Sequence, residues 1–114
     1  MIAVIFEVEI LPGHEGDYLA IAASLLPELQ TIDGFISIER FQSLTTEGKL
    51  LSLSFWRDEE AVAQWRNLER HREAQKRGRA EIFSDYRLRI GSIVRDYGFR
   101  NRDEAPTDSR AAID

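Results

Sequence analysis

The amino-acid sequence predicts an α+β fold with a single antiparallel sheet, and three observations lead to this prediction. Four segments alternate at the two-residue period of a β-strand. Two segments repeat apolar residues at the three- and four-residue steps of an amphipathic helix. The chain has 114 residues, of which 43% are hydrophobic, enough for the core of one domain. The segments follow one another in the order β-α-β-β-α-β.

The first half of the chain contains three strands and one helix. The first strand spans residues 2–11 and ends at Pro12-Gly13, a pair that favours a turn. A helix follows over residues 14–31. Its apolar stripe comprises Tyr18, Ile21, Ala22, Leu25, Leu26 and Leu29. Residues 35–42 and 50–56 are strands, and the short glycine-containing loop between them predicts an antiparallel hairpin.

The second helical segment begins after Asp58, a residue type that caps helix N-termini well, and runs to about residue 80. Asn67 marks a predicted break, because no single apolar stripe covers both halves of the segment. Residues 85–97 alternate again and form the last strand.

This order of elements is that of the ferredoxin-like fold, in which the helices cover one face of the sheet. The sequence places this domain at residues 1–99. Residues 100–114 are polar and aperiodic, and we expect them to form a flexible tail.

The composition argues against several classes of function. The formal net charge of −5 disfavours binding to nucleic acid and to anionic membranes, both of which need a basic surface. The absence of cysteine excludes disulfides, thiolate metal sites and cysteine nucleophiles. No apolar run approaches the roughly 20 residues of a membrane-spanning helix, and the first residues lack the features of a signal peptide. We therefore expect a soluble cytoplasmic protein.

A second packing surface is predicted on the sheet. If Leu51, Leu53 and Phe55 face the helices, the opposite sheet face carries large aromatic side chains among small polar ones. That face comprises Phe35, Ser37, Glu39, Phe41, Leu50, Ser52, Ser54 and Trp56. Exposing one such ring to water forgoes roughly 1.5–3 kcal/mol, so faces of this kind usually meet a partner or a ligand. Packing of two such faces predicts a symmetric homodimer.

Several short motifs accompany this order of elements. They are Gly34-Phe35, Ser54-Phe55-Trp56, the helical run from Glu59 to Trp65, His71, Gln75 and Gly78-Arg79. Together they resemble the antibiotic biosynthesis monooxygenase domain, a branch of the dimeric α+β barrel superfamily, over about residues 1–98. The resemblance implies a dimer of ferredoxin-like units with a pocket between the sheet and the second helix. Some relatives oxidise polycyclic phenols with molecular oxygen and without metal, flavin or haem, because the deprotonated substrate supplies the electrons.

His71 is the predicted catalytic residue, since its unperturbed pKa of about 6.5 suits acid–base work near neutrality. The alternative is a structural histidine that packs and hydrogen-bonds. The predicted substrate-binding residues are Trp56, Trp65, Gln75, Arg79 and Tyr86. Both tryptophans have an alternative role as core anchors. Arg79 has the alternative of a solvated helix end, and Tyr86 that of a packing residue.

We expect no metal and no cofactor. No histidine–carboxylate cluster has the spacing of a metal site. Haem-degrading relatives carry an axial histidine at the position that Gln75 occupies here, which disfavours haem and leaves His71 as a shifted alternative ligand.

Three functions follow as hypotheses. The first is cofactor-independent oxidation of a small aromatic or hydrophobic compound by a homodimer. The second is a non-catalytic ligand-binding or stress-associated dimer. The third is isomerase or lyase chemistry, which needs a carboxylate such as Glu7 or Glu39 facing His71. An open pocket of roughly 300 Å³ or more near His71 favours the first hypothesis, and a filled one favours the second.

Overall fold

The computed structural model describes residues 1–113, and the side chains of all of these except residues 69, 70 and 113. Within these residues the order of elements is β-α-β-β-α-β, as predicted, followed by a short helix. The strands are β1 (Ile2–Ile10), β2 (Phe35–Gln42), β3 (Lys49–Trp56) and β4 (Phe83–Ser92). The helices are α1 (Glu15–Leu29), α2 (Glu59–Arg66), α3 (Glu69–Arg77), the single π-helical turn η1 (Gly78–Ile82) and α4 (Thr107–Ile113).

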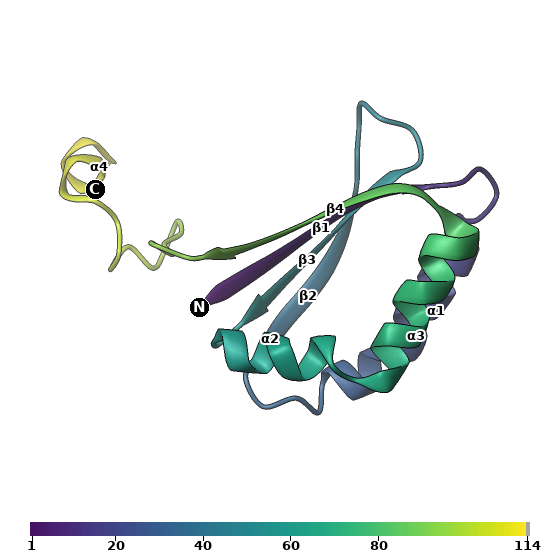
Figure 1. Ribbon diagram of the computed structural model, residues 1–114. Helices are drawn as coiled ribbons and strands as arrows, with labels where there is room; N and C mark the ends of the chain where they lie inside the picture. The colour runs from purple at the N-terminus through teal and green to yellow at the C-terminus, as the bar shows by residue number, and fades with distance from the viewer. Residues whose placement is uncertain (114) are drawn as a thin grey trace.

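The four strands form one antiparallel sheet in the order β2-β3-β1-β4. Strands β1 and β3 lie in the centre, and β2 and β4 form the edges. Helices α1, α2 and α3 lie on the same side of the sheet, with α1 and α3 side by side (Figure 1). This arrangement is the ferredoxin-like α+β fold that the element order predicts.

The strand register decides which side chains face the helices. Residues opposite each other in an antiparallel pair point to the same face of the sheet. The register pairs Val4 with Ser54 and Phe6 with Ser52, and the even-numbered residues of β1 and β3 therefore share a face. Trp56 belongs to this set and is almost completely buried, at 1% exposure. The helices thus cover the face that contains the two serines.

The assignment of the β3 faces made from the sequence is therefore wrong. Leu51, Leu53 and Phe55 lie on the uncovered face, together with Ile5 of β1, which pairs with Leu53. Both faces of β3 carry large apolar side chains, so hydrophobicity alone does not decide which face meets the helices. The serines on one face made that face look like the uncovered one.

Two separate groups of buried residues form the core between the sheet and the helices. The first group comprises Leu29, Ile32, Trp56, Ala61 and Val62. The second group comprises Val8, Ile10, Tyr18 and Ile82. Along β3, Trp56 belongs to the first group and Leu50 packs against the second, and Ser52 and Ser54 lie between them. The small serine side chains leave space in the middle of the core.

The second helical segment is broken, as the sequence predicts at Asn67. The side chain of Asp58 begins α2 by accepting a hydrogen bond from the Ala61 N–H at 2.9 Å, and this bond lowers the pKa of Asp58. Helix α2 ends at Arg66, and Asn67 is its C-terminal cap. Helix α3 then starts in a new direction (Figure 1). The last strand differs from the prediction, because β4 ends at Ser92 rather than near residue 97.

Gly78 has a packing role at the junction between α3 and η1. A Cβ atom at this position would lie 2.7 Å from two carbons of the Phe83 ring. We expect Gly78→Ala to displace this ring and lower the free energy of unfolding by about 1–3 kcal/mol, measured by urea denaturation. Gly91→Ala is the matched control, since a Cβ there meets nothing within 4 Å. Equal stability of both variants and the wild type would contradict this role.

The chain after β4 extends beyond the edge of the domain (Figure 1). It includes α4 and contacts within itself, among them a hydrogen bond from the Gly98 N–H to the Asn101 carbonyl. The flexibility of residues 100–114 stays a prediction, and residue 114 lies outside the described residues. None of the helices in the described part of the chain has the length and apolar character needed to cross a membrane.

Candidate active site

A cavity of about 370 Å³ lies between the sheet and the helices, and we call it the inner cavity. Its sheet side is formed by Val4, Phe6, Ile38, Arg40, Ser52 and Ser54. Its helix side includes Tyr18, Val62, Trp65, His71 and Gln75. The cavity occupies the space that the two serines leave between the two groups of buried residues. Most of its surface is apolar, so it suits a hydrophobic molecule with a few polar groups.

His71 lines the inner cavity and is held in place by Trp65. The two rings stack at a centroid distance of 4.3 Å and an angle of 19°. The Nδ1 atom of His71 lies 3.0 Å from the Trp65 carbonyl oxygen. Because a carbonyl oxygen only accepts, Nδ1 carries the proton in the neutral ring and Nε2 keeps a free lone pair. None of the protein groups that the structure describes forms a hydrogen bond to Nε2.

The environment of His71 also favours the neutral ring. Burial lowers the pKa of His71, because transfer from water penalises the charged imidazolium, and the nearby Arg72 lowers it further. The hydrogen bond to the Trp65 carbonyl acts in the opposite direction and does not reverse the shift. At neutral pH His71 is therefore an uncharged ring that can accept a proton at Nε2.

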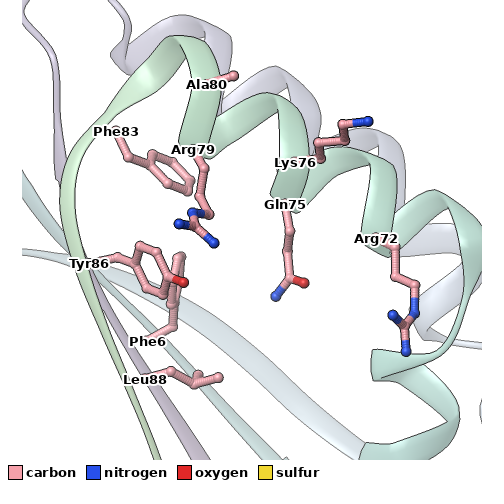
Figure 2. A pocket seen from close by; sticks show the side chains of 9 residues that line it. All are labelled: Phe6, Arg72, Gln75, Lys76, Arg79, Ala80, Phe83, Tyr86 and Leu88. Carbon is pink, nitrogen blue, oxygen red and sulfur yellow. The ribbon is translucent and has the colours of Figure 1, made fainter.

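A second cavity of about 590 Å³ adjoins the first at the β4 edge of the sheet, and we call it the outer cavity. Phe6, Gln75, Phe83 and Leu88 line both cavities. Arg79 and Gln75 extend from the helix toward the strand side chains, among them Tyr86, whereas Lys76 points away from them (Figure 2). The outer cavity therefore joins an apolar floor to a basic rim beside the inner cavity.

The structure brings five of the six predicted site residues to these cavities. His71, Trp65 and Gln75 line the inner cavity, and Gln75, Arg79 and Tyr86 line the outer one. Trp56 is the exception, because it is not among the described lining residues of either cavity. It lies in the core, where its Nε1 donates to Ser54 Oγ at 2.9 Å and its ring lies 6.5 Å from that of Trp65. Trp56 thus supports the wall from behind.

Arg40 is a cavity residue that the sequence reasoning missed. It lies on the helix-covered face of β2, where it pairs with Ser52 across the sheet. Arg40 is half-buried, and its Nε atom is buried without a hydrogen-bond partner among the described residues. The sequence contained a signal for this residue, because alternation along β2 places the charged Arg40 on the same core-facing side as Ile38.

Glu7 and Glu39, the carboxylates that the isomerase or lyase hypothesis pairs with His71, do not line the cavity. Glu39 pairs with Leu53, and Glu7 pairs with Leu51, which places both on the uncovered face of the sheet. Glu7 binds Arg89 there at 2.9 Å, and this hydrogen bond lowers the pKa of Glu7. In the described part of the chain no acidic side chain lines either cavity. The isomerase or lyase hypothesis therefore lacks the carboxylate that it needs.

The side chains of the two cavities do not form a metal site within the described residues. Among the residues that the structure describes, no group of three or more His, Asp or Glu side chains is arranged to hold a metal ion. The polar groups of the cavities include an imidazole, an amide, serine and tyrosine hydroxyls, a lysine ammonium and several guanidinium groups. These groups donate and accept hydrogen bonds, so the site is suited to acid–base chemistry and to binding an anion.

Known proteins resemble this chain in sequence and in fold. The jasmonate monooxygenase ABM of Pyricularia oryzae is 50% identical over 94 residues, which are 82% of this chain and 44% of that protein. The uncharacterised protein YqjZ of Bacillus subtilis is 25% identical over 67 residues, which are 59% of this chain and 57% of that protein. The chain thus spans about half the length of these curated relatives.

A solved structure shares the fold over nearly its whole length. Protein Rv0793 of Mycobacterium tuberculosis superimposes with a TM-score of 0.75 at 15% identity, covering 85% of this chain and 98% of that chain. The family model described as antibiotic biosynthesis monooxygenase matches residues 1–77. This match includes β1 to α3, and with them the cavity residues from Val4 to Gln75. The chain belongs to the antibiotic biosynthesis monooxygenase family.

Proposed function

We propose that this protein is a monooxygenase that oxidises a small aromatic or hydrophobic compound in the inner cavity. The observation that carries the proposal is the open space beside His71. The inner cavity has a volume of about 370 Å³ and adjoins the uncharged imidazole. Pockets for small molecules occupy about 300–1,000 Å³ and are mostly apolar, as this one is. Membership of the monooxygenase family supports the same function.

The proposed reaction uses electrons from the substrate. Nε2 of His71 removes a proton from an acidic C–H or O–H group and leaves an electron-rich anion, which reacts with molecular oxygen. A CH₂ group becomes a carbonyl, one oxygen atom enters the product, and the other leaves with the two hydrogens as water. This step balances without an external reductant, metal, flavin or haem. The cavity contributes the position of the substrate and the exclusion of water.

Jasmonate is the first compound to test. The relative that is 50% identical over 94 aligned residues is named as a jasmonate monooxygenase. We propose that this chain accepts jasmonate or a compound of similar size and polarity. The measurement is oxygen uptake by purified protein with jasmonate and a panel of phenols, without added metal or reductant.

A cavity-filling variant makes this experiment specific. Ala74 lines the inner cavity, and Ala74→Phe places a ring in the space beside it. We expect the wild type to consume oxygen with at least one compound and the variant to lose both binding and uptake. Binding by the wild type without any oxygen uptake would favour the non-catalytic ligand-binding dimer instead.

The pH dependence of the reaction follows from the lowered pKa of His71. A base must be neutral, and an unperturbed histidine becomes protonated below about pH 6.5. Because burial lowers the pKa of His71, we expect kcat/KM to stay constant as the pH falls through 6.5 and to decline only at lower pH. An acidic limb centred at or above 6.5 would contradict this assignment.

The same shift predicts a change in stability with pH. The unfolded chain takes up the proton near pH 6.5, and the folded chain takes it up only at lower pH. The contribution to the free energy of unfolding is therefore complete above about pH 6.5 and is lost as the pH falls from there to the folded pKa. His71→Gln is expected to remove this dependence in urea denaturation at a series of pH values.

The proposed functional unit is a homodimer formed through the uncovered sheet face. This face carries Ile5, Leu51, Leu53 and Phe55 at its centre, and Phe41 is 42% exposed beside them. The helices α1 to α3 lie on the opposite side and leave this face open (Figure 1). An apolar sheet face of this kind is normally covered by a partner, and packing the same face of two copies gives a closed, two-fold symmetric dimer.

A further inference from the structure

We propose that Arg40, Ser52 and Ser54 form an anion-binding site inside the inner cavity and that the substrate is an apolar monocarboxylic acid. The three side chains approach from β2 and β3 on the floor of the cavity. This inference rests on the proposed function, because it names the class of molecule that the same cavity accepts.

The first observation is the unpaired guanidinium of Arg40. Its Nε atom is buried and has no hydrogen-bond partner, and no ion pair involves this side chain within the described residues. An unsatisfied buried polar group costs about 1–3 kcal/mol, and more when it is charged. Most arginines avoid this cost by pairing with a carboxylate. Arg40 faces a cavity with no acidic side chain in its described lining, and a ligand carboxylate can therefore supply the missing acceptor.

The second observation is the pair of serine hydroxyls beside Arg40. The register pairs Arg40 with Ser52 and pairs Ile38 with Ser54, so both serines share the face of Arg40. Ser54 Oγ already accepts a hydrogen bond from the Trp56 indole, and its own proton is therefore directed elsewhere. Neither hydroxyl donates a hydrogen bond to another group that the structure describes. The floor of the cavity thus offers donors without matching acceptors.

The third observation is the apolar surface that surrounds these donors. Val4, Phe6 and Ile38 lie next to the serines and Arg40 on the sheet, and Leu25 faces them from α1. A molecule that satisfies the donors with a carboxylate must fill the remaining space with hydrocarbon. The planar guanidinium matches the two oxygens of a carboxylate in a bidentate pair. The combination selects an acid with one charged end and an apolar body.

The position of this site also orients the bound molecule. Arg40 lies on the edge strand β2, whereas the outer cavity opens beside β4 at the opposite edge of the sheet. An acid held by Arg40 therefore enters from the β4 side with its charged end first. Its apolar body then lies along the row of Ser52, Phe6 and Leu88, which the register places across the sheet. His71 and Gln75 line the same cavity from the helix side.

The test uses a matched pair of ligands, 2-naphthoate and its uncharged isostere 2-naphthamide, with affinities measured by isothermal titration calorimetry. We expect the wild type to bind the acid at least about 10-fold more tightly than the amide, since hydrogen bonds to charged groups contribute more than neutral ones. Arg40→Met keeps the volume of the side chain and is expected to abolish this preference, because it weakens binding of the acid far more than binding of the amide. Arg40→Lys keeps the charge without the bidentate geometry and is expected to retain part of it.

The control is Arg87→Met, because Arg87 lies on the uncovered face of β4, where it pairs with Glu7. This variant is expected to keep the full preference for the acid. The proposal is overturned if the wild type binds acid and amide equally or binds neither. It is also overturned if the preference survives in Arg40→Met, or if Arg79→Met removes it instead and so places the anion at the basic rim of the outer cavity.

These measurements separate the anion site from the proposed reaction. A preference for the acid that depends on Arg40, without oxygen uptake on any compound, supports the anion site and contradicts the monooxygenase proposal. Oxygen uptake that Arg40→Met leaves unchanged, without a preference for the acid, supports the monooxygenase and contradicts the anion site.

Discussion

Replacing His71 with glutamine is expected to lower kcat by roughly 100-fold or more, because a positioned general base contributes about 10²–10⁴-fold to a proton transfer. Glutamine can still donate a hydrogen bond to the Trp65 carbonyl, which His71 contacts at 3.0 Å, but it cannot accept a proton near neutral pH. The fold is therefore expected to persist, with thermal unfolding close to that of the wild type. Steady-state kinetics with the compound found by oxygen uptake provide the measurement.

The surface histidine provides the matched control for this substitution. His14 is the partly exposed N-terminal cap of α1 and binds Asp17 at 2.9 Å, and it is not among the described lining residues of either cavity. His14→Gln is expected to leave kcat unchanged. If both variants retain wild-type turnover, the role of His71 as a base is wrong, and His71 is the packing histidine that the sequence also allows.

Replacing Leu53 with arginine is expected to raise the dissociation constant of the proposed dimer by at least about 100-fold. Leu53 lies on the uncovered face of β3, between Ile5 of β1 and Glu39 of the edge strand β2. In a two-fold symmetric assembly the substitution replaces two packed leucines by two cations, and removing these cations from water costs several kcal/mol that the Glu39 opposite each of them offsets only in part. Sedimentation velocity over a range of concentrations measures the change.

Leu19 provides the control for this second prediction. It is a leucine of α1 with 48% exposure, on the side of the domain that carries the helices. Leu19→Arg is expected to leave the assembly unchanged. The proposed dimer is contradicted if the wild-type protein stays monomeric at micromolar concentration. It is also contradicted if the Leu53→Arg variant associates as well as the wild type.

The sequence predicted the order of elements because each element carries its own periodicity and its own turn or cap. The break at Asn67 is an example, since the two halves of the helical segment have different apolar stripes. The contact between Trp65 and His71 depends on this break. Six residues along an unbroken helix, at 3.6 residues per turn, place two side chains on well-separated faces. The chain turns between α2 and α3 and thereby brings the two rings to 4.3 Å.

The faces of β3 could not be predicted from local pattern alone. Apolar side chains occur on both faces because one face meets the helices and the other is open and apolar. Ser52 and Ser54 looked like exposed residues, although they are buried at 8% and 5% exposure. A ligand cavity inside a small core requires small side chains at central positions. The two serines that led to the wrong assignment of the β3 faces are thus the residues that make room for the cavity.

The strand that carries Arg40 has an irregularity near its start. The register shifts between Phe35 and Ser37, so that Phe35 pairs with Trp56 and packs against the core beside Ile38. Strict alternation would place Phe35 and Ile38 on opposite faces. The irregularity places Phe35 on the helix-covered face, whereas Arg40 lies on the face that alternation from Ile38 predicts and is the one arginine of this strand that lines the inner cavity.

The most direct test of the proposed function is the origin of the oxygen in the product. Purified protein is incubated with jasmonate and the phenol panel under ¹⁸O₂, without added metal, flavin, haem or reductant, and the products are analysed by mass spectrometry. The proposed reaction predicts one ¹⁸O atom per product molecule, and loss of this product in His71→Gln and Ala74→Phe. A product that contains oxygen from water even when its carbonyl is reduced to the alcohol at once to prevent exchange, or labelled product formed equally by both variants, would contradict oxidation by His71 in the inner cavity.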